Sequence, residues 1–292
     1  NCDRIKTGNF RKNQRLIENR KGKRMRKTEL NGAWQILECG KEEICDVTVP
    51  GTVLSGFLAE KKIEDPFYRT NEDTTRELFW KDYEFKRSFE ISEELLKEEK
   101  TELVCEGLDT LTEIYVNGEF VAKTDNMHRI WKFDIKHLLK SGKNEIRIIF
   151  RSVLKYIEEH QPEEKKEIQY VPCGCMRGNQ WIRKAHSMFG WDWGPQTIDA
   201  GIFRDIYLES YSHARIEDVR IRQIHGKSVT VNAEVKLSGE FTGKNKILAK
   251  ISECGAEESE IQSKEAEEES VFSFEIKSPK LWWPNGYGEQ PL

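Results

Sequence analysis

The sequence lacks any long apolar run. No segment approaches the ~18 consecutive apolar residues that a membrane-spanning helix needs, so we expect no membrane partner. The first 30 residues also lack the apolar core of a secretory signal peptide. Asn-x-Ser/Thr glycosylation sequons are missing throughout the chain, which suits a protein that never meets a glycosylation pathway. These absences predict a location in the cytoplasm.

Cysteine is sparse and odd in number. The seven cysteines are scattered along 292 residues, a length sufficient to build an apolar core. This usage favours free thiols in a reducing compartment over a disulfide framework. Cys173 and Cys175 have the wrong spacing for a Cys-x₂-Cys zinc knuckle, and no partner motif accompanies them. We therefore expect neither a metal nor a cofactor.

Charge of one sign does not dominate the chain. The 47 Lys/Arg and 51 Asp/Glu residues give a net charge of −4, which argues against nucleic acid as a partner. Residues 1–29 are the exception, a basic extension that is densest over residues 20–27 (RKGKRMRK). Aromatic residues are nearly missing there, and nothing downstream continues the basic theme. We interpret the extension as a solvated leader helix or a disordered extension rather than as a nucleic-acid patch.

The pattern that is present is that of β-strands. Residues 81–90 (KDYEFKRSFE) alternate aromatic with polar side chains, and Asn117-Gly118 is typical of a tight hairpin turn. Further strand candidates are residues 101–106, 113–116, 120–122 and 145–150. Helix-like segments are short, at residues 93–99 and 152–166. Many short strands joined by turns predict an all-β sandwich or barrel.

A second β unit begins near residue 213. Alternating stretches that predict a small immunoglobulin-like sandwich lie at residues 214–223, 228–237, 246–253 and 271–276. The acidic run 257–270 predicts an exposed edge and loop. About five strand signals precede Leu292, where seven are typical, so we expect this sandwich to be incomplete at its C-terminus. An unclosed sheet exposes its edges and permits self-association with another copy.

Residues 189–195 (FGWDWGP) place two indoles around a single carboxylate, that of Asp192. Indoles are costly to leave in water, and a carboxylate is costly to bury unpaired. A pocket that stacks a sugar ring on the indoles and binds its hydroxyls through the carboxylate resolves both costs. Alternatively, the tryptophans belong to the core and Asp192 pairs with Arg183 or Lys184. Residue chemistry alone leaves both interpretations open.

The stretch from residue 182 to residue 195 (IRKAHSMFGWDWGP) resembles the N-terminal region of the β-mannosidases of glycoside hydrolase family 2. Other similar stretches follow the family's order, at residues 30–34, 49–53, 65–68, 71–72, 106–110, 116–118, 124–127, 201–204 and 281–286. The resemblance therefore runs from about residue 30 to the end. It implies a jelly-roll, galactose-binding-like β-sandwich over residues 30–212, followed by an immunoglobulin-like sandwich over residues 213–292.

The resemblance also implies a retaining exo-β-mannosidase, which hydrolyses terminal β-D-mannose of oligosaccharides with two carboxyl groups about 5–5.5 Å apart. In the family both glutamates lie on a (β/α)₈ barrel that is C-terminal to the two sandwiches. This chain shows no alternation of strands and helices that could supply the barrel. We therefore expect no catalytic residue in it, no hydrolysis by the chain alone, and the barrel as its partner.

The resemblance assigns a sugar-binding role to the Trp-Asp-Trp loop. Asp192 would accept hydrogen bonds from hydroxyls of the terminal sugar, and Trp191 and Trp193 would provide an apolar platform. Arg183 would hold the carboxylate ionised and oriented, or alternatively would form only a surface ion pair. His186 departs from the family, whose members often carry Gln there, and only His titrates near neutral pH.

Two other functions remain open. One is a β-galactosidase or β-glucuronidase relative, although these share the two-sandwich layout without usually carrying this loop. The other is a free-standing carbohydrate-binding or scaffold protein.

The remaining motifs indicate architecture. We expect Trp34 and Trp80 to be core aromatics, and Asp109 and Asn126 to be hydrogen-bonding loop residues. Residues 281–288 (LWWPNGYG) are interpreted as an interdomain or core element rather than as a second sugar platform, because large apolar groups dominate interface energetics.

Overall fold

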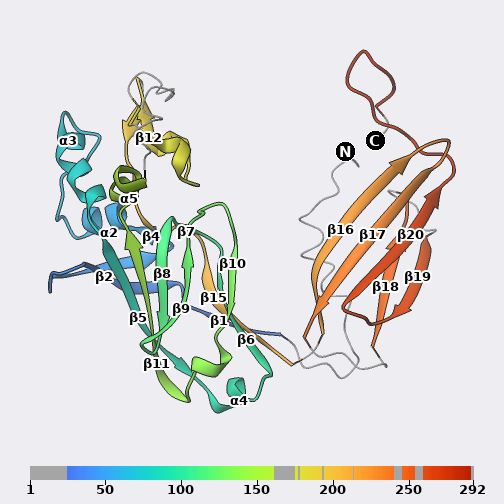
Figure 1. Ribbon diagram of the computed structural model, residues 1–292, viewed down its shortest axis with the longest axis horizontal. Coiled ribbons are helices and arrows are strands. Elements are labelled where there is room, and N and C mark those ends of the chain that lie inside the picture. The colour runs from blue at the N-terminus through green and yellow to red at the C-terminus, as the bar shows by residue number, and fades with distance from the viewer. Residues whose placement is uncertain are drawn as a thin grey trace. The chain divides into compact units, whose positions relative to one another are not determined.

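A computed structural model describes residues 25–290, except 161–174, 177, 193, 213, 240–244 and 254–258. The described chain divides between Ser210 and Tyr211 into two compact units (Figure 1). Strands dominate both units, which confirms the all-β prediction. Within the described ranges, no helix has both the length and the apolar character needed to cross a membrane.

The first unit consists of short strands with a few helical turns between them. Its strands are β1 (Arg26–Glu29), β2 (Gly32–Glu38), β3 (Ile44–Val49), β4 (Gly51–Thr52), β5 (Tyr83–Ile91), β6 (Lys100–Cys105), β7 (Leu108–Asp109), β8 (Leu111–Val116), β9 (Glu119–Thr124), β10 (Trp131–Asp134), β11 (Gly142–Arg151), β12 (Phe189–Trp191), β13 (Gly194–Gln196), β14 (Gly201–Ile202) and β15 (Ile206–Tyr211). Its helical elements are α2 (Val53–Ala59), α3 (Asn71–Thr75), η2 (Arg76–Trp80), α4 (Glu93–Leu96), η3 (Lys136–Leu138), α5 (Val153–His160), η5 (Asn179–Trp181) and η6 (His186–Met188).

Two sheets of the first unit enclose one apolar core. The six-stranded sheet has the order β3-β2-β5-β11-β8-β9, and the four-stranded sheet has the order β1-β15-β6-β10. Phe85 and Ile148 from the first sheet join Leu103 and Leu208 from the second in a single buried cluster. Trp34 belongs to the same cluster, as predicted. The period-two alternation therefore marks the face of each strand that packs inward.

Local turn chemistry fixes the register of this sandwich. Asn117 and Gly118 form the β8–β9 turn with φ of +52° and +88°, the left-handed values that an Asn-Gly turn supplies.

The two predicted helices differ in length from those in the structure. Helix α4 is shorter than the predicted 93–99. Helix α5 covers only the first part of the predicted 152–166, and its remainder lies outside the described residues.

The basic extension was predicted to reach residue 29, but the structure places Arg26–Glu29 in strand β1, paired with β15. Lys27 lies over the Tyr207 ring at 3.8 Å, and Arg26 pairs with Glu94 at 3.2 Å. Long basic side chains can cover apolar surface with their stems while keeping their charges in water. A basic run can therefore include an edge strand. Residues 1–24 lie outside the described residues.

The second unit has five described strands in two sheets. They are β16 (Arg215–His225), β17 (Val229–Ser238), β18 (Lys246–Ile251), β19 (Glu260–Glu265) and β20 (Glu269–Ile276). The sheets have the orders β16-β17-β20 and β18-β19. Phe272, Val235 and Ile247 belong to a core cluster with members from both sheets. The five described strands of this unit therefore match the five or so strand signals predicted from the sequence.

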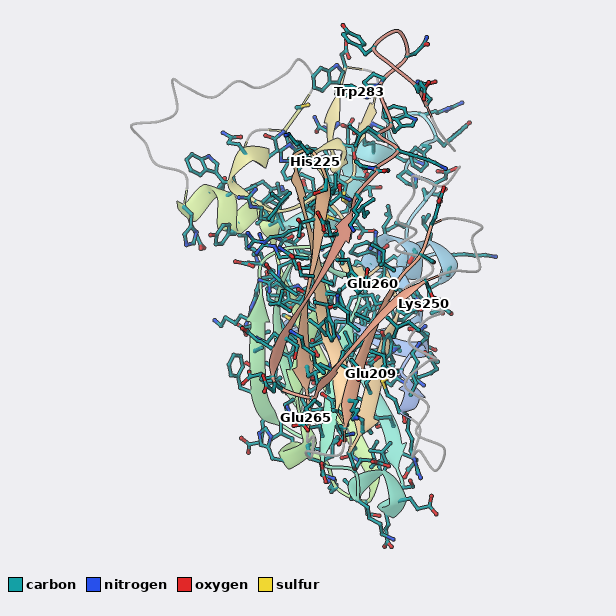
Figure 2. The ribbon with its side chains drawn as sticks, turned by 90° about the vertical axis from the view of Figure 1, so that its right-hand side faces the viewer. Glu209, His225, Lys250, Glu260, Glu265 and Trp283 are labelled. Carbon is teal, nitrogen blue, oxygen red and sulfur yellow. The ribbon has the colours of Figure 1, made fainter. Side chains whose placement is uncertain are left out.

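The acidic run of the second unit forms more strand than the predicted edge and loop. Strand β19 pairs with β18 from Lys246↔Glu265 to Ile251↔Glu260, and nearly all of its side chains are exposed. Glu260 and Glu265 mark its two ends in Figure 2, with Lys250 on the neighbouring strand. Because both faces of this strand are largely exposed, its sequence does not alternate apolar with polar residues, and the run could not be predicted as a strand.

Candidate functional site

The Trp-Asp-Trp segment forms a tight hairpin. Strand β12 pairs with β13 through Phe189↔Gln196 and Trp191↔Gly194, and Asp192 lies in the turn that follows β12. Gly190 has a φ of +86°, a value that favours glycine. Figure 1 shows the hairpin at the same end of the first unit as α3 and α5. The hairpin therefore carries Asp192 at its tip.

The predicted sugar-binding residues differ in exposure. The Asp192 residue is exposed, and Trp191 retains 36% of its accessible surface. Trp193 lies outside the described residues. The carboxylate can accept hydrogen bonds from hydroxyl groups, and the partly exposed indole beside it can stack on the apolar face of a ring. The alternative that Trp191 is a core residue does not hold.

Both edges of the hairpin are held by hydrogen bonds. On one side the Met176 amide donates to the Phe189 carbonyl at 2.8 Å. On the other, the Gln196 amide donates to Glu72 Oε1 at 2.8 Å. Arg76 donates to the same Glu72 oxygen at 2.8 Å, and these two donors hold the pKa of Glu72 below its usual value. Glu72 is thus an ionised anchor from helix α3.

A second apolar cluster packs against the hairpin and includes one of its residues. Fully buried Phe189 from β12 packs with Ile157 of α5, and with Ile182 and Ile198 from the segments that enter and leave the hairpin. Gly178, with φ of +92°, approaches Ile157 so closely that no side chain would fit there. Trp80 is only partly buried against this cluster, which is a weaker core role than predicted. The hairpin therefore has a small core of its own.

The two basic candidates, Arg183 and Lys184, have opposite environments. The Arg183 residue is exposed, and its carbonyl accepts from the Met127 amide at 3.0 Å. The Lys184 side chain is fully buried, with Nζ 2.5 Å from Asp109 Oδ2 and 2.6 Å from the Asp199 carbonyl oxygen. In the part of the chain that the structure describes, no ion pair joins Asp192 to either residue. Lys184 therefore pairs with Asp109 and not with Asp192.

Burial shifts the pKa values of both Lys184 and Asp199, and the charges around each group oppose the shift. Burial lowers the pKa of the Lys184 ammonium, although nearby Asp109 opposes the shift. Burial raises the pKa of Asp199 to about 6, even though its Oδ1 accepts from the Leu54 amide at 3.1 Å and the Ala200 amide at 2.8 Å. Because Lys184, Asp109 and Asp199 are all buried, these side chains hold the structure together and do not contact solvent-borne ligands.

Several further predictions can be compared with the structure. Asn126 acts as a loop hydrogen-bonder, since its Oδ1 accepts from the His128 amide at 2.9 Å. Asp109 does more than was predicted, because it forms a buried ion pair. Residues 281–288 are exposed in the second unit, so they do not belong to its core, and their interpretation as an interdomain element stays a prediction. Large exposed apolar side chains there are Leu281, Trp282, Trp283 and Tyr287.

Two residues were missed as parts of the site, namely Lys184 as a buried cation and Glu72 as an anchor. Both lie in stretches that carry the family resemblance, and this was the only signal that could have found them. His186 is an exposed residue of η6. Among the described residues, no group of three or more His, Cys, Asp or Glu side chains is placed to hold a metal ion.

An open groove of about 800 Å³ lies away from the hairpin. It is lined by residues of β2, β3, β5 and α2, including Gln35, Asp46 and Lys86. Among the described residues that line it, the single aromatic is Trp34, which is buried in the core and offers no exposed indole face. Sugar sites usually combine polar groups with an aromatic face, so the hairpin is the better candidate.

Comparison with known proteins places both units in one family. Residues 34–204 match the model described as glycosyl hydrolase 2 galactose-binding domain-like, and residues 214–292 match that of the glycosyl hydrolases of family 2. These matches confirm the predicted galactose-binding-like sandwich and the immunoglobulin-like region after it.

Similar curated proteins include the β-mannosidase of Mus musculus, 29% identical over 278 residues, and β-mannosidase B of Emericella nidulans, 29% identical over 279 residues. The matches cover 89% and 90% of this chain, but 31% and 32% of those proteins. The chain thus spans about a third of the length of the curated relatives it matches, at their N-terminal end.

Two solved structures extend the comparison. The β-D-mannosidase of Dictyoglomus thermophilum is 30% identical with a TM-score of 0.75, and the match covers 91% of this chain and 33% of that one. The β-D-glucuronidase of the same organism is 17% identical with a TM-score of 0.55, over 90% of this chain and 40% of that one. The second likeness shows the fold alone.

Proposed function

The chain belongs to glycosyl hydrolase family 2, and on this premise we propose that it is the N-terminal, non-catalytic part of a retaining exo-β-mannosidase. The observation that carries the proposal is the anchored β12–β13 hairpin, which exposes Asp192 beside the indole of Trp191. The two carboxyl groups that cleave the glycosidic bond would lie on a barrel outside this chain.

In this proposal the hairpin binds the terminal mannose of a β-linked oligosaccharide. A carboxylate accepts from two hydroxyls at once, and each such charge-assisted bond contributes roughly 1.5–3 kcal/mol. Trp191 and Trp193 would supply the apolar platform. Glu72, on the far edge of the hairpin, would keep the loop in place.

Similarity to the relatives supports mannose as the sugar. Proteins named β-mannosidase align with nearly all of this chain at 29–30% identity. The β-glucuronidase structures are 15–17% identical and support the shared fold only. The described cysteines, Cys39, Cys45, Cys105 and Cys175, are free thiols, which supports the cytoplasmic location that we also propose.

The test is made in the longer enzyme that this proposal supposes. We expect Asp192→Asn to lower kcat/KM for p-nitrophenyl β-D-mannoside at least tenfold, about 1.4 kcal/mol, because the carboxylate helps bind the transition state. Asp46→Asn is the matched control, because Asp46 is an exposed carboxylate on β3 and should leave kcat/KM unchanged. An unchanged kcat/KM for Asp192→Asn would remove the hairpin from the site. If the longer enzyme hydrolysed β-galactosides or β-glucuronides in preference to β-mannosides, mannose would not be its sugar.

A further inference from the structure

Lys184 lies at the start of the segment that carries the hairpin, and Asp199 lies at its end. The Lys184 ammonium donates to the Asp199 main-chain carbonyl at 2.6 Å. This bond joins the two ends of residues 185–198, which contain η6, β12, the Asp192 turn and β13. A single side chain thus closes the base of the segment.

The closed base is also tied to the body of the first unit. The same ammonium lies 2.5 Å from Asp109 Oδ2, and Asp109 belongs to β7, which pairs with β14. On the other side, Asp199 Oδ1 accepts from the Leu54 amide in the first turn of α2. The entry and exit of the hairpin segment are therefore fixed to two separate elements.

The energetics of a buried lysine argue for a geometric role. Removing two charges from water offsets most of the attraction between them, so a buried ion pair is weak evidence for added stability, and an apolar residue often serves packing equally well. An apolar side chain cannot bond the Asp199 carbonyl, however. The property that is specific to Lys184 is the link it makes across the base of the segment.

We propose that Lys184 is a positioning residue, whose ammonium joins both ends of residues 185–198 to Asp109 and so sets where the hairpin presents Asp192. This inference rests on the proposed function of Asp192 in sugar binding. Lys184 itself touches no sugar, since its side chain is fully buried. It acts through the position of the loop.

Hydrogen exchange of the chain, followed by mass spectrometry, tests the link without any sugar. In Lys184→Met we expect the amides of residues 185–198 to exchange at least tenfold faster, with β5 and β11 unchanged. Lys155→Met is the matched control, because it removes an exposed lysine that lies 3.5 Å from Asp82. The control should leave hairpin exchange unchanged. Parent-like exchange of residues 185–198 in folded Lys184→Met would overturn the proposal.

A double variant keeps the test decisive if Lys184→Met fails to fold. Such a failure would follow from an unpaired buried Asp109 carboxylate, which Asp109→Asn removes. We expect Asp109→Asn/Lys184→Met to unfold cooperatively while its hairpin still exchanges fast. Equal acceleration in every segment of this double variant would mean that Lys184 only stabilises the fold, and would overturn the proposal.

Activity in the longer enzyme separates positioning from stability. We expect Asp109→Asn/Lys184→Met to lower kcat/KM for the β-mannoside at least tenfold, with little further loss when Asp192→Asn is added, because both changes act through one carboxylate. Full additivity would contradict a role through Asp192. If the hairpin exchanges fast but no Asp192 variant alters kcat/KM, the proposed function fails while the link across the base stands.

Discussion

In the body of the first unit, β5 and β11 pair continuously from Ile91↔Gly142 to Tyr83↔Phe150, over a core that both sheets share. At the hairpin end, β12 and β13 pair at only two positions. An isolated two-stranded hairpin is marginal in water, so the second region needs other support. It receives that support from the bonds of Glu72 and Met176, a small apolar cluster and the buried charges around Lys184.

The two regions show how one unit can combine a stable scaffold with a hairpin that is held in one defined position. The body depends on apolar burial, which tolerates small shifts in direction. The hairpin depends on hydrogen bonds and ion pairs, whose geometry is strict. A carboxylate that must meet particular hydroxyl groups is better positioned by the second kind of contact.

The largest change in the free energy of unfolding is expected from a substitution in the core of the first unit. Phe85 is fully buried, with its ring centroid 5.0 Å from that of Phe150. Phe85→Ala should lower the free energy of unfolding by about 3–5 kcal/mol, through lost burial and the cavity left behind. Phe67→Ala, at a side chain that is 73% exposed, should change it by less than about 0.5 kcal/mol. Denaturant titration measures both, and equal losses would contradict the assigned core.

The next effect concerns the buried charges beneath the hairpin. The folded pKa of Asp199, about 6, lies above its unfolded value, so ionising this group opposes folding. Its stabilising contribution is complete below the unfolded pKa, near 4, and is lost as the pH rises through about 6. Asp199→Asn cannot ionise and retains an acceptor for the Leu54 amide.

The free energy of unfolding of Asp199→Asn, minus that of the parent, should therefore rise by roughly 2–3 kcal/mol between pH 4 and pH 7. The difference should be level above pH 7. Denaturant titrations at a series of pH values measure it. Subtracting the parent removes the opposite contributions of carboxylates with lowered pKa, such as Glu72 and Asp82. A pH-independent difference would show that Asp199 titrates normally.

The smallest effect is a local one at the edge of the hairpin. Glu72→Ala removes the acceptor of the Gln196 amide, which should cost about 1–2 kcal/mol of local opening free energy. Hydrogen exchange at Gln196 should then be about tenfold faster, with the β5–β11 amides unchanged. Glu77→Ala, at an exposed neighbour on η2, should alter neither region. Faster exchange throughout the body would mean that the two regions are one cooperative unit.

The sequence predicted the body better than the hairpin end, because the body follows local rules. Alternation over residues 81–90 identifies the inward face of β5, and Asn117-Gly118 identifies the turn between β8 and β9. These signals act over a few residues. The same logic failed for β1 and β19, because most of their side chains are exposed and neither strand alternates apolar with polar residues.

The base of the hairpin could not be predicted, because its contacts join distant segments. Lys184 pairs with Asp109, which lies 75 positions earlier in the chain. No local pattern distinguishes the exposed Arg183 from the buried Lys184, since both are basic and adjacent. Only the fold decides which of them points inward.

The most direct test of the central claim, that this chain supplies half of a mannose site, uses the chain as it is. Tryptophan fluorescence follows its titration with mannose and β-1,4-mannobiose, and the same sample is assayed with p-nitrophenyl β-D-mannoside. We predict no turnover and weak or undetectable binding, because in the proposed function the catalytic carboxylates and the rest of the pocket would lie outside this chain. Turnover would contradict the claim outright, and tight binding without turnover would replace it with a free-standing carbohydrate-binding module.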